Sequence, residues 1–397
     1  MAITISEKDE KRRTFILEGD MWKVLISIAV PLVLYNSISQ LFSLFDILIA
    51  SNMSAAVAST VSFISQIQSM LSAIGGGLAV GGGILIARHF GAGDMERMNK
   101  NINTLVFLAL IISLFILMLV IPFSTQFLQF LRMPRDLQET GSVYFILETA
   151  MLICIFINTI YFSIEKAKGN TKIILFCNIL MFTLKLGATL FLVYVIGGGI
   201  LLLSAASLVS HLGITCIAIK NMTGRKNPFR LSFRYIDFSA ETLKPILILS
   251  LPVFMEKFVF SLGKVIVNSM SAAYGSMVVG ALGISNRISA ISTTPPIGVE
   301  EAEASIISQN LGNNNIARAL AIFKRTFIIN MGLGLFFFVM MTVFKEQIIT
   351  LFAKSDLLFA AEIEKIYNYE RYATILLAAS SSVMGLLYGF GYTRISM

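Results

Sequence analysis

Charged residues are scarce in this sequence. Asp, Glu, Lys and Arg make up 14% of its 397 residues, whereas soluble domains carry about 25%. Because 56% of the residues are hydrophobic, the chain is too apolar for a disordered protein, a coiled coil or an ordinary soluble domain. With a mean hydropathy of +0.80, the class that remains is a polytopic membrane protein.

Cysteine and histidine are also rare. Cys154, Cys177 and Cys216 lie inside apolar stretches and lack the spacing of a metal or redox pair, which excludes a disulfide scaffold. His89 and His211 are isolated, so we expect no metal site. The loops are short and carry no His-Glu-x-x-His motif. We therefore expect no catalytic residue, no cofactor and no enzymatic activity.

Long apolar runs fill most of the chain. A membrane helix needs about 20 mostly apolar residues, and ten stretches meet this requirement. They are 24–50, 56–86, 104–122, 143–167, 173–196, 199–219, 244–271, 277–308, 322–344 and 369–390. Because the runs are continuous rather than short and alternating, they favour helices over the strands of a barrel. The predicted fold class is an all-α polytopic protein of the lipid bilayer.

Lys and Arg outnumber Asp and Glu, giving a net charge of +8, and their distribution predicts the orientation. Twenty-one lie in the N-terminal arm, at Lys23 and in alternate loops. The other side has six, which are Arg132, Arg135, Lys345, Lys354, Lys365 and Arg371. Since cytoplasmic loops collect positive charge, we expect a cytoplasmic N-terminus in the cell membrane and no nucleic-acid partner.

The two halves of the chain resemble each other. A shift of 221 positions superimposes Pro31 on Pro252 and Gly91 on Gly312. The shift moves by six spans, an even number, which predicts parallel repeats about an axis along the membrane normal. The first repeat has six spans and the second only four, so two helices are expected to be missing from the second.

These patterns predict four segments. Residues 1–20 are polar and mixed in charge, and the following apolar run is too long for a cleavable signal peptide, so they form a cytosolic arm. Residues 21–220 form an N-lobe, 221–243 a cytosolic linker, and 244–397 a C-lobe with four spans. Two such lobes around a central cavity are typical of secondary transporters.

Several short motifs resemble those of the multidrug and toxic compound extrusion (MATE) family. They are Leu44-Phe-Asp-Ile-Leu48, Ala87-Arg-His-Phe-Gly-Ala-Gly-Asp94, Gly169-Asn-Thr-Lys172, Gly283-Ile-Ser-Asn-Arg287 and Ser308-Gln-Asn-Leu-Gly312 followed by Arg318-Ala319. The resemblance covers essentially the whole chain. It implies a MATE/MOP-like fold with twelve helices, of which two are absent here. It also implies a cation-coupled exporter of amphipathic, often cationic, small molecules, which we expect to be a monomer.

Asp46 lies toward the outer end of the first span. Ionisable groups inside a span are energetically costly, so their default interpretation is functional. The resemblance implies that this acidic residue titrates or binds the coupling cation of the first lobe. The alternative is an interfacial carboxylate held by the helix end or by water.

Lys185 and Thr189 stand where the family often has Asn-x-x-x-Asp. Because an ammonium only donates hydrogen bonds, it does not replace the oxygen ligands that a sodium ion needs. This favours a proton over sodium as the coupling ion. We hypothesise that Asp46 and Lys185 form a pair whose protonation changes between the outward and inward states. A structural ion pair and a snorkelling lysine are the alternatives.

The seventh and eighth spans carry further charges. Glu256, Lys264, Arg287, Glu300 and Glu303 are the candidates for a substrate cavity, where acidic groups would attract cationic compounds. Following a break at Pro295-Pro296, Glu300 and Glu303 share a helical face, whereas Glu301 points elsewhere. Glu300 is twelve residues before Gly312, about 18 Å along a helix and near mid-membrane. A Glu–Lys/Arg network joining the two spans is the alternative.

One other transport function remains open. A flippase for lipid-linked oligosaccharides or peptidoglycan precursors, from the same superfamily, would need a strongly cationic cavity for a pyrophosphate. The acidic residues argue against it, although Lys185, Lys257, Lys264 and Arg287 leave room. The glycine runs 75–77 and 81–83 lack the context of a phosphate-binding loop, and they favour close helix approach. The expected function is therefore multidrug efflux by alternating access.

Overall fold

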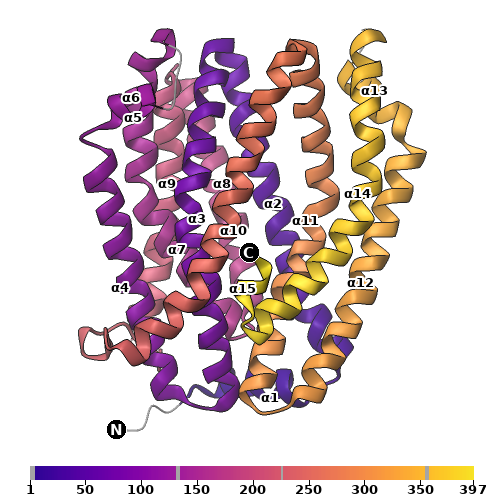
Figure 1. The fold of residues 1–397 in the computed structure, drawn as a ribbon. Helices are drawn as coiled ribbons and strands as arrows, with labels where there is room; N and C mark the ends of the chain where they lie inside the picture. Colours follow the sequence, from indigo (N-terminus) through magenta and orange to yellow (C-terminus); the bar gives the residue numbers. More distant parts are fainter. Residues whose placement is uncertain (1–4, 131–134, 225–226, 354–356) are drawn as a thin grey trace.

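A computed structural model describes residues 5–130, 135–224, 227–353 and 357–397, and in these residues the chain is a bundle of helices without strands (Figure 1). The first half contains α1 (Glu7–Glu18), α2 (Met21–Met53), α3 (Ala55–Ala92), α4 (Met95–Val120), α5 (Ser124–Phe130), α6 (Arg135–Ala150), α7 (Leu152–Ala167), α8 (Thr171–Thr189), the π-helical turn η1 (Leu190–Val195) and α9 (Ile200–Thr223). The second half contains α10 (Ala240–Ser271), α11 (Ser276–Gly312), α12 (Ile316–Val343), α13 (Lys345–Ala353), α14 (Leu357–Phe390) and α15 (Thr393–Ser396). The short 3₁₀ turns η2 (Phe233–Tyr235) and η3 (Ala272–Tyr274) lie before and after α10.

Nine helices among the described residues are long and apolar enough to cross a membrane. The eighth predicted span, 277–308, is the one outside these nine, and it forms α11, which runs through the bundle beside the others (Figure 1). α11 is long enough to cross a membrane but less apolar than these nine helices, because it carries Arg287, three glutamates and many small polar residues. The expected break at Pro295-Pro296 is wrong, since α11 continues through both prolines. Neighbouring helices stabilise proline inside such segments.

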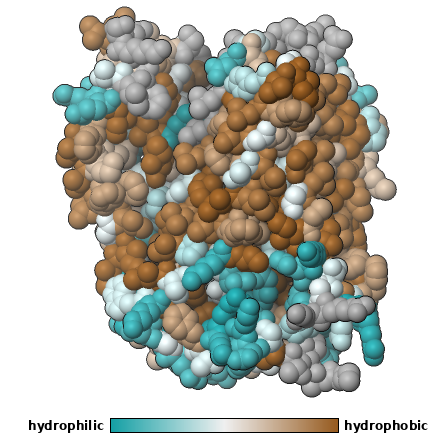
Figure 2. All heavy atoms as spheres, turned by 180° about the vertical axis from the view of Figure 1, so that it is seen from behind, coloured by the Kyte–Doolittle hydropathy of each residue, from teal (hydrophilic) through white to brown (hydrophobic). Residues whose placement is uncertain are grey.

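The outer surface is apolar over most of its height. Figure 2 shows a broad hydrophobic face with hydrophilic residues gathered at the lower end, which is the end where α1 lies in Figure 1. Phe115, Met118 and Leu119 on α4 are among the exposed apolar side chains. Such a surface matches the hydrocarbon region of a bilayer. Of the basic residues assigned to the opposite side, Arg132 and Lys354 lie outside the described residues, as does the side chain of Arg135.

Glycines allow the two halves to pack closely. A Cβ at Gly77 of α3 would lie 2.7 Å from backbone atoms of Phe254 on α10. A Cβ at Gly298 of α11 would lie 2.6 Å from the backbone of Val33 on α2. Gly298 lies 221 positions after Gly77, and Phe254 lies 221 positions after Val33. The two contacts are therefore related by the sequence shift that superimposes the halves. Because neither site has room for a side chain, the glycine runs serve helix packing.

The same relation holds at the α1 end of the bundle, where the halves meet most tightly. A Cβ at Gly91 would lie 2.0 Å from the carbonyl oxygen of Gln309, and a Cβ at Gly312 would lie 1.9 Å from that of Arg88. The Gln309 side-chain amide donates to the carbonyl of Ala167 at 2.8 Å. Arg88 donates to the carbonyl of Phe390 at 3.0 Å. These contacts close the bundle at this end.

Helix α1 bridges the two halves across the closed end. Ser6 caps the helix by accepting a hydrogen bond from the backbone of Asp9. Arg13 donates to the carbonyl of Gly91 in the first half at 3.0 Å. From the second half, Arg318 donates to the carbonyl oxygens of Ile16, at 3.2 Å, and Gly19. Within the polar arm predicted for residues 1–20, the described part therefore forms helix α1, which contacts both halves.

The segment between the halves is held against α4. The backbone amide of Ser232 donates to the side chain of Asn103 at 2.7 Å. The backbone of Asp237 exchanges hydrogen bonds with the Thr104 hydroxyl at 3.0 and 3.2 Å. Hydrogen bonds from the Thr242 hydroxyl and from Ser239 lower the pKa of the Asp237 carboxyl. The connection into α10 is thus anchored to the first half.

We predict that Gly312→Ala disfavours the arrangement closed at the α1 end. The added Cβ would meet the Arg88 carbonyl, and overpacking of this kind costs about 1–3 kcal/mol. The measurement uses Thr159→Cys on α7, a reporter position that lines a cavity between the two halves, in a chain whose three native cysteines are replaced. A membrane-impermeant maleimide added from the α1 side should label the Gly312→Ala protein faster than its parent.

Gly283→Ala, on the same helix, is the matched control, because a Cβ at that position would meet nothing within 4 Å. Equal labelling of the Gly312→Ala protein and its parent would contradict the packing argument.

Candidate functional site

A cavity of about 210 Å³ lies between the two halves. Helices α2, α3 and α7 of the first half and α10, α11 and α14 of the second contribute to its lining. The lining is largely apolar, with a polar and charged set formed by Tyr35, Asn36, Thr159, Ser163, Lys166, Lys257, Glu300, Glu301, Ser305, Ser308 and Tyr388. The hydrogen bonds of Ser305 and Gln309 to the first half separate the cavity from the α1 end.

One ion pair in the cavity joins the two halves. The ammonium of Lys166 on α7 lies 2.7 Å from a carboxylate oxygen of Glu301 on α11. Their side chains are 22% and 27% exposed, so a molecule in the cavity has access to both groups. Sequence reasoning placed Glu301 away from the cavity, and this is wrong.

The face of α11 that lines the cavity explains why Glu301, and not Glu303, lies there. Ile297, Glu300, Glu301, Ala304, Ser305 and Ser308 line the cavity, following the three- and four-residue spacing of one helical face. Glu303 lies on the other side of the helix, fully buried, where one of its oxygens would be 2.5 Å from a Cβ at Gly385 of α14. Glu303 therefore does not line this cavity, contrary to the sequence-based prediction.

The other candidates of the second half occupy different surroundings. Glu300 lines the cavity, within electrostatic reach of Lys257 on α10. Glu256 accepts a hydrogen bond from the hydroxyl of Tyr388 at 2.8 Å, so it reaches the cavity through that tyrosine. Lys264 is exposed and lies over the ring of Phe260, 4.7 Å from its centre. Arg287 is half-buried on α11, and neither Lys264 nor Arg287 lines the cavity.

A second group of charged residues lies inside the first half. The ammonium of Lys185 on α8 contacts the carboxylate of Asp46 on α2. Lys185 is 1% exposed and Asp46 is 24% exposed. Thr189, one turn beyond Lys185, is fully buried. The structure thus brings the predicted partners Asp46 and Lys185 together.

Sequence reasoning missed Glu148, the third charged residue of this group. Glu148 on α6 is buried and accepts hydrogen bonds from Ser204 and Gln68, each at 2.8 Å. The charge of Lys185 acts on it. The signal was available, because Glu148 is an ionisable residue inside a predicted span. Asp46, Lys185 and Glu148, called the buried triad below, comprise one ammonium, one carboxylate in direct contact with it and a second carboxyl group within its electrostatic reach.

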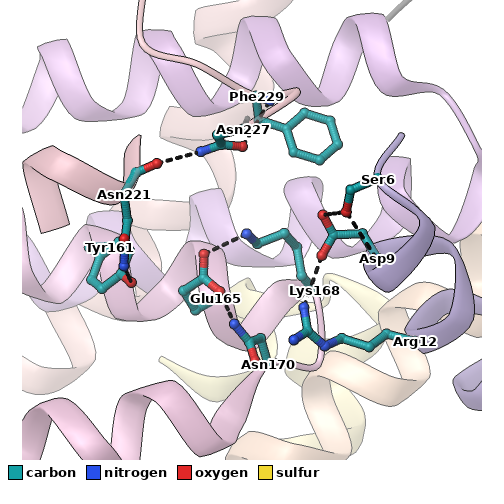
Figure 3. Close-up of polar contacts among 10 residues, drawn as sticks. All are labelled: Ser6, Asp9, Arg12, Tyr161, Glu165, Lys168, Asn170, Asn221, Asn227 and Phe229. Atoms are coloured by element: carbon teal, nitrogen blue, oxygen red, sulfur yellow. Dashed lines mark hydrogen bonds and ion pairs between the residues drawn. The ribbon is translucent and has the colours of Figure 1, made fainter. Parts of the chain in front are cut away.

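The Gly169-Asn-Thr-Lys172 motif fixes the turn after α7. Figure 3 shows Glu165 between Lys168 and Asn170, both of which donate to its carboxylate at 2.5 Å. Gly169 has a φ of +72°, which favours glycine, and the side chain of Ile16 from α1 packs where its Cβ would lie. Lys168 forms an ion pair with Glu165, whereas Lys166 forms its ion pair with Glu301.

A helical membrane protein with two halves around a cavity that is closed at one end has the form of a transporter. The MatE family model matches residues 31–191 and 252–397. The chain belongs to this family, as the motifs of its sequence predicted, and it is a multi-pass membrane transporter.

Named relatives and solved structures agree with this assignment. The chain is 21% identical over 341 residues to the probable multidrug resistance protein YoeA of Bacillus subtilis (strain 168), covering 84% of this chain and 73% of that protein. It is 21% identical over 315 residues to the multidrug export protein MepA of Staphylococcus haemolyticus (strain JCSC1435), covering 77% and 68%.

Among solved structures, an outward-facing MATE transporter of the MOP superfamily matches with a TM-score of 0.91 and 20% identity, over 99% of this chain and 87% of that chain. A MOP superfamily transporter from Pyrococcus furiosus, described as having a binding pocket of reverse polarity, matches with a TM-score of 0.90 and 20% identity, over 99% and 87%. The all-α membrane fold predicted from the sequence is confirmed.

We predict that Lys185→Met destabilises the protein by leaving Asp46 without its partner. Removing one member of a buried ion pair costs about 3–5 kcal/mol. The measurement is the midpoint of thermal unfolding in detergent. The double variant Lys185→Met/Asp46→Asn should recover most of the loss, because the carboxylate that pairs directly with Lys185 is neutralised as well, and Glu148 keeps its hydrogen bonds from Ser204 and Gln68.

Lys264→Met is the control, since this lysine is exposed and, among the described residues, its recorded contact is with the ring of Phe260. An equal decrease of the unfolding midpoint in Lys185→Met and Lys264→Met would show that the ion pair with Asp46 does not contribute specifically to stability.

Proposed function

We propose that this chain is a secondary active multidrug transporter. It exports amphipathic organic compounds, cations among them, across the cytoplasmic membrane in exchange for a coupling cation, and the proton is that cation. The observation that carries the proposal is the combination of an accessible charged cavity between the halves with a separate buried triad in the first half. The names of the two relatives support the multidrug assignment.

Alternating access accounts for the closed end. The distribution of Lys and Arg supports a cytoplasmic N-terminus, and with that orientation the end closed by Gly91, Gly312 and α1 faces the cytoplasm. Residues 21–220 and 244–397 act as two lobes connected by the linker 221–243. In the transport cycle the lobes separate at this end and approach each other at the other end. The monomer is the functional unit.

The buried triad suits a proton better than a sodium ion. Sodium needs several oxygen ligands, whereas the ammonium of Lys185 already occupies the position beside Asp46. Because the triad has two carboxyl groups and one ammonium, binding of one proton would balance its charge. When Asp46 takes up a proton, Lys185 loses its direct partner, and Glu148 is a carboxyl group within its electrostatic reach. Asp46 is the entry point, because it is the more exposed member of its pair.

The flippase alternative is less well supported. A pyrophosphate carries several negative charges and calls for unmatched cations. In the cavity Lys166 is matched by Glu301, and Lys257 lies within electrostatic reach of Glu300. Of the basic residues considered for the flippase, Lys185, Lys264 and Arg287 do not line this cavity.

The test is export of ethidium, an organic cation, from proteoliposomes under separate proton and sodium gradients. We expect a proton gradient to drive export and a sodium gradient to have little effect. Asp46→Asn should lower proton-driven export at least tenfold, because the asparagine no longer carries the exchanged proton. Lys264→Met should export as the parent does.

Export driven by sodium alone, or full proton-driven export in Asp46→Asn, would contradict the proposed coupling. Failure of either gradient to drive export of any compound would contradict secondary transport.

A further inference from the structure

We propose that Glu301 is the substrate-binding carboxylate of the cavity and that Lys166 is its built-in competitor. In the empty cavity the ammonium of Lys166 occupies the position that a cationic substrate takes when it binds. This inference rests on the proposed transport function, and it assigns the site to organic monocations with an apolar body.

The placement of the pair makes competition direct. Lys166 comes from α7 and Glu301 from α11, so the 2.7 Å contact crosses the interface between the halves. Both side chains line the cavity and remain about one-quarter exposed. The Asp46–Lys185 pair differs in this respect, because its lysine is 1% exposed. A ligand in the cavity reaches the carboxylate of Glu301 without unpacking a helix.

The pair is not needed to hold the halves together. The hydroxyl of Ser305 donates to the carbonyl of Lys166 at 2.8 Å, and Gln309 donates to the carbonyl of Ala167 at the same distance. These bonds use the backbone of α7 and leave the Lys166 side chain free to move. Partly exposed ion pairs contribute little net free energy, so a substrate displaces the lysine at small cost.

The surroundings of Glu301 favour an organic cation. The rings of Tyr35 on α2 and Phe162 on α7 pack edge to face, with centres 5.7 Å apart, and both line the cavity. An aromatic wall beside a carboxylate binds an ammonium or aromatic cation through charge and through its ring faces. Among the other charged groups facing the site, Glu300 is adjacent on α11, and Lys257 on α10 is within electrostatic reach of Glu300.

The pair therefore reports whether the cavity is occupied. While a cation sits on Glu301, Lys166 has lost its partner across the interface, and the contact between α7 and α11 is weakened. Once the cation leaves, the ion pair forms again and adds to the closure at the α1 end. In an exporter, the ion pair that forms after release opposes the return of the compound, because Glu301 is then occupied by Lys166.

The test is equilibrium binding of ethidium to the purified full chain in detergent, followed by fluorescence anisotropy. Lys166→Gln should lower the Kd about threefold to fivefold, because a competing ion pair of ordinary strength is removed. Glu301→Gln should raise the Kd about tenfold. A double variant with both changes should behave as Glu301→Gln does. A purely structural ion pair predicts changes of the same sign in both single variants.

Lys172→Gln is the matched control, because this neighbouring lysine is exposed and does not line the cavity. Lys166→Arg should keep the Kd of the parent. Weaker or unchanged binding by Lys166→Gln, while the parent binds ethidium, would overturn the competition but leave the proposed function standing. Absence of binding by the parent would overturn the inference and the proposed substrate class together.

Discussion

The approach of backbone to backbone at the α1 end governs the rest of this structure. Gly91 against Gln309 and Gly312 against Arg88 bring α3 and α11 together at distances that exclude any side chain. That contact sets the positions of Ser305 and Gln309 against α7. It thereby closes the cavity on one side and brings Lys166 within reach of Glu301. Without the glycines, the charged residues of the two halves would face each other across a gap.

The two groups of charged residues differ in a way that suits separate tasks. The buried triad lies within the first half and is shielded from the cavity at Lys185 and Glu148. The Lys166–Glu301 pair crosses the interface and is partly exposed. In the proposed exchange, a proton acts at the triad, whereas a larger organic molecule acts at the Lys166–Glu301 pair. Helix α2 connects the two sites, because it carries Asp46 of the triad and Tyr35 of the cavity lining.

The sequence predicted the helices well because a membrane span has one dominant requirement, about 20 apolar residues. It also predicted that Asp46 and Lys185 belong together, since a buried charge needs a partner. It failed at Glu301 and Glu303, where spacing along one helix was used without knowing which stripe of α11 faces the cavity. Pairs such as Lys166 and Glu301, from helices far apart in sequence, follow from packing and have no local signal.

The hydrogen bonds across the closed end share a further property. Arg13, Arg88, Ser305, Gln309 and Arg318 each donate from a side chain to a backbone carbonyl across the joint or at its edge. Water is a ready substitute donor for a carbonyl, so each of these acceptors can be rehydrated in the lobe separation that we propose. Mutation of an accepting residue also leaves its carbonyl in place. The joint therefore resembles a wet, reversible interface more than a folded core.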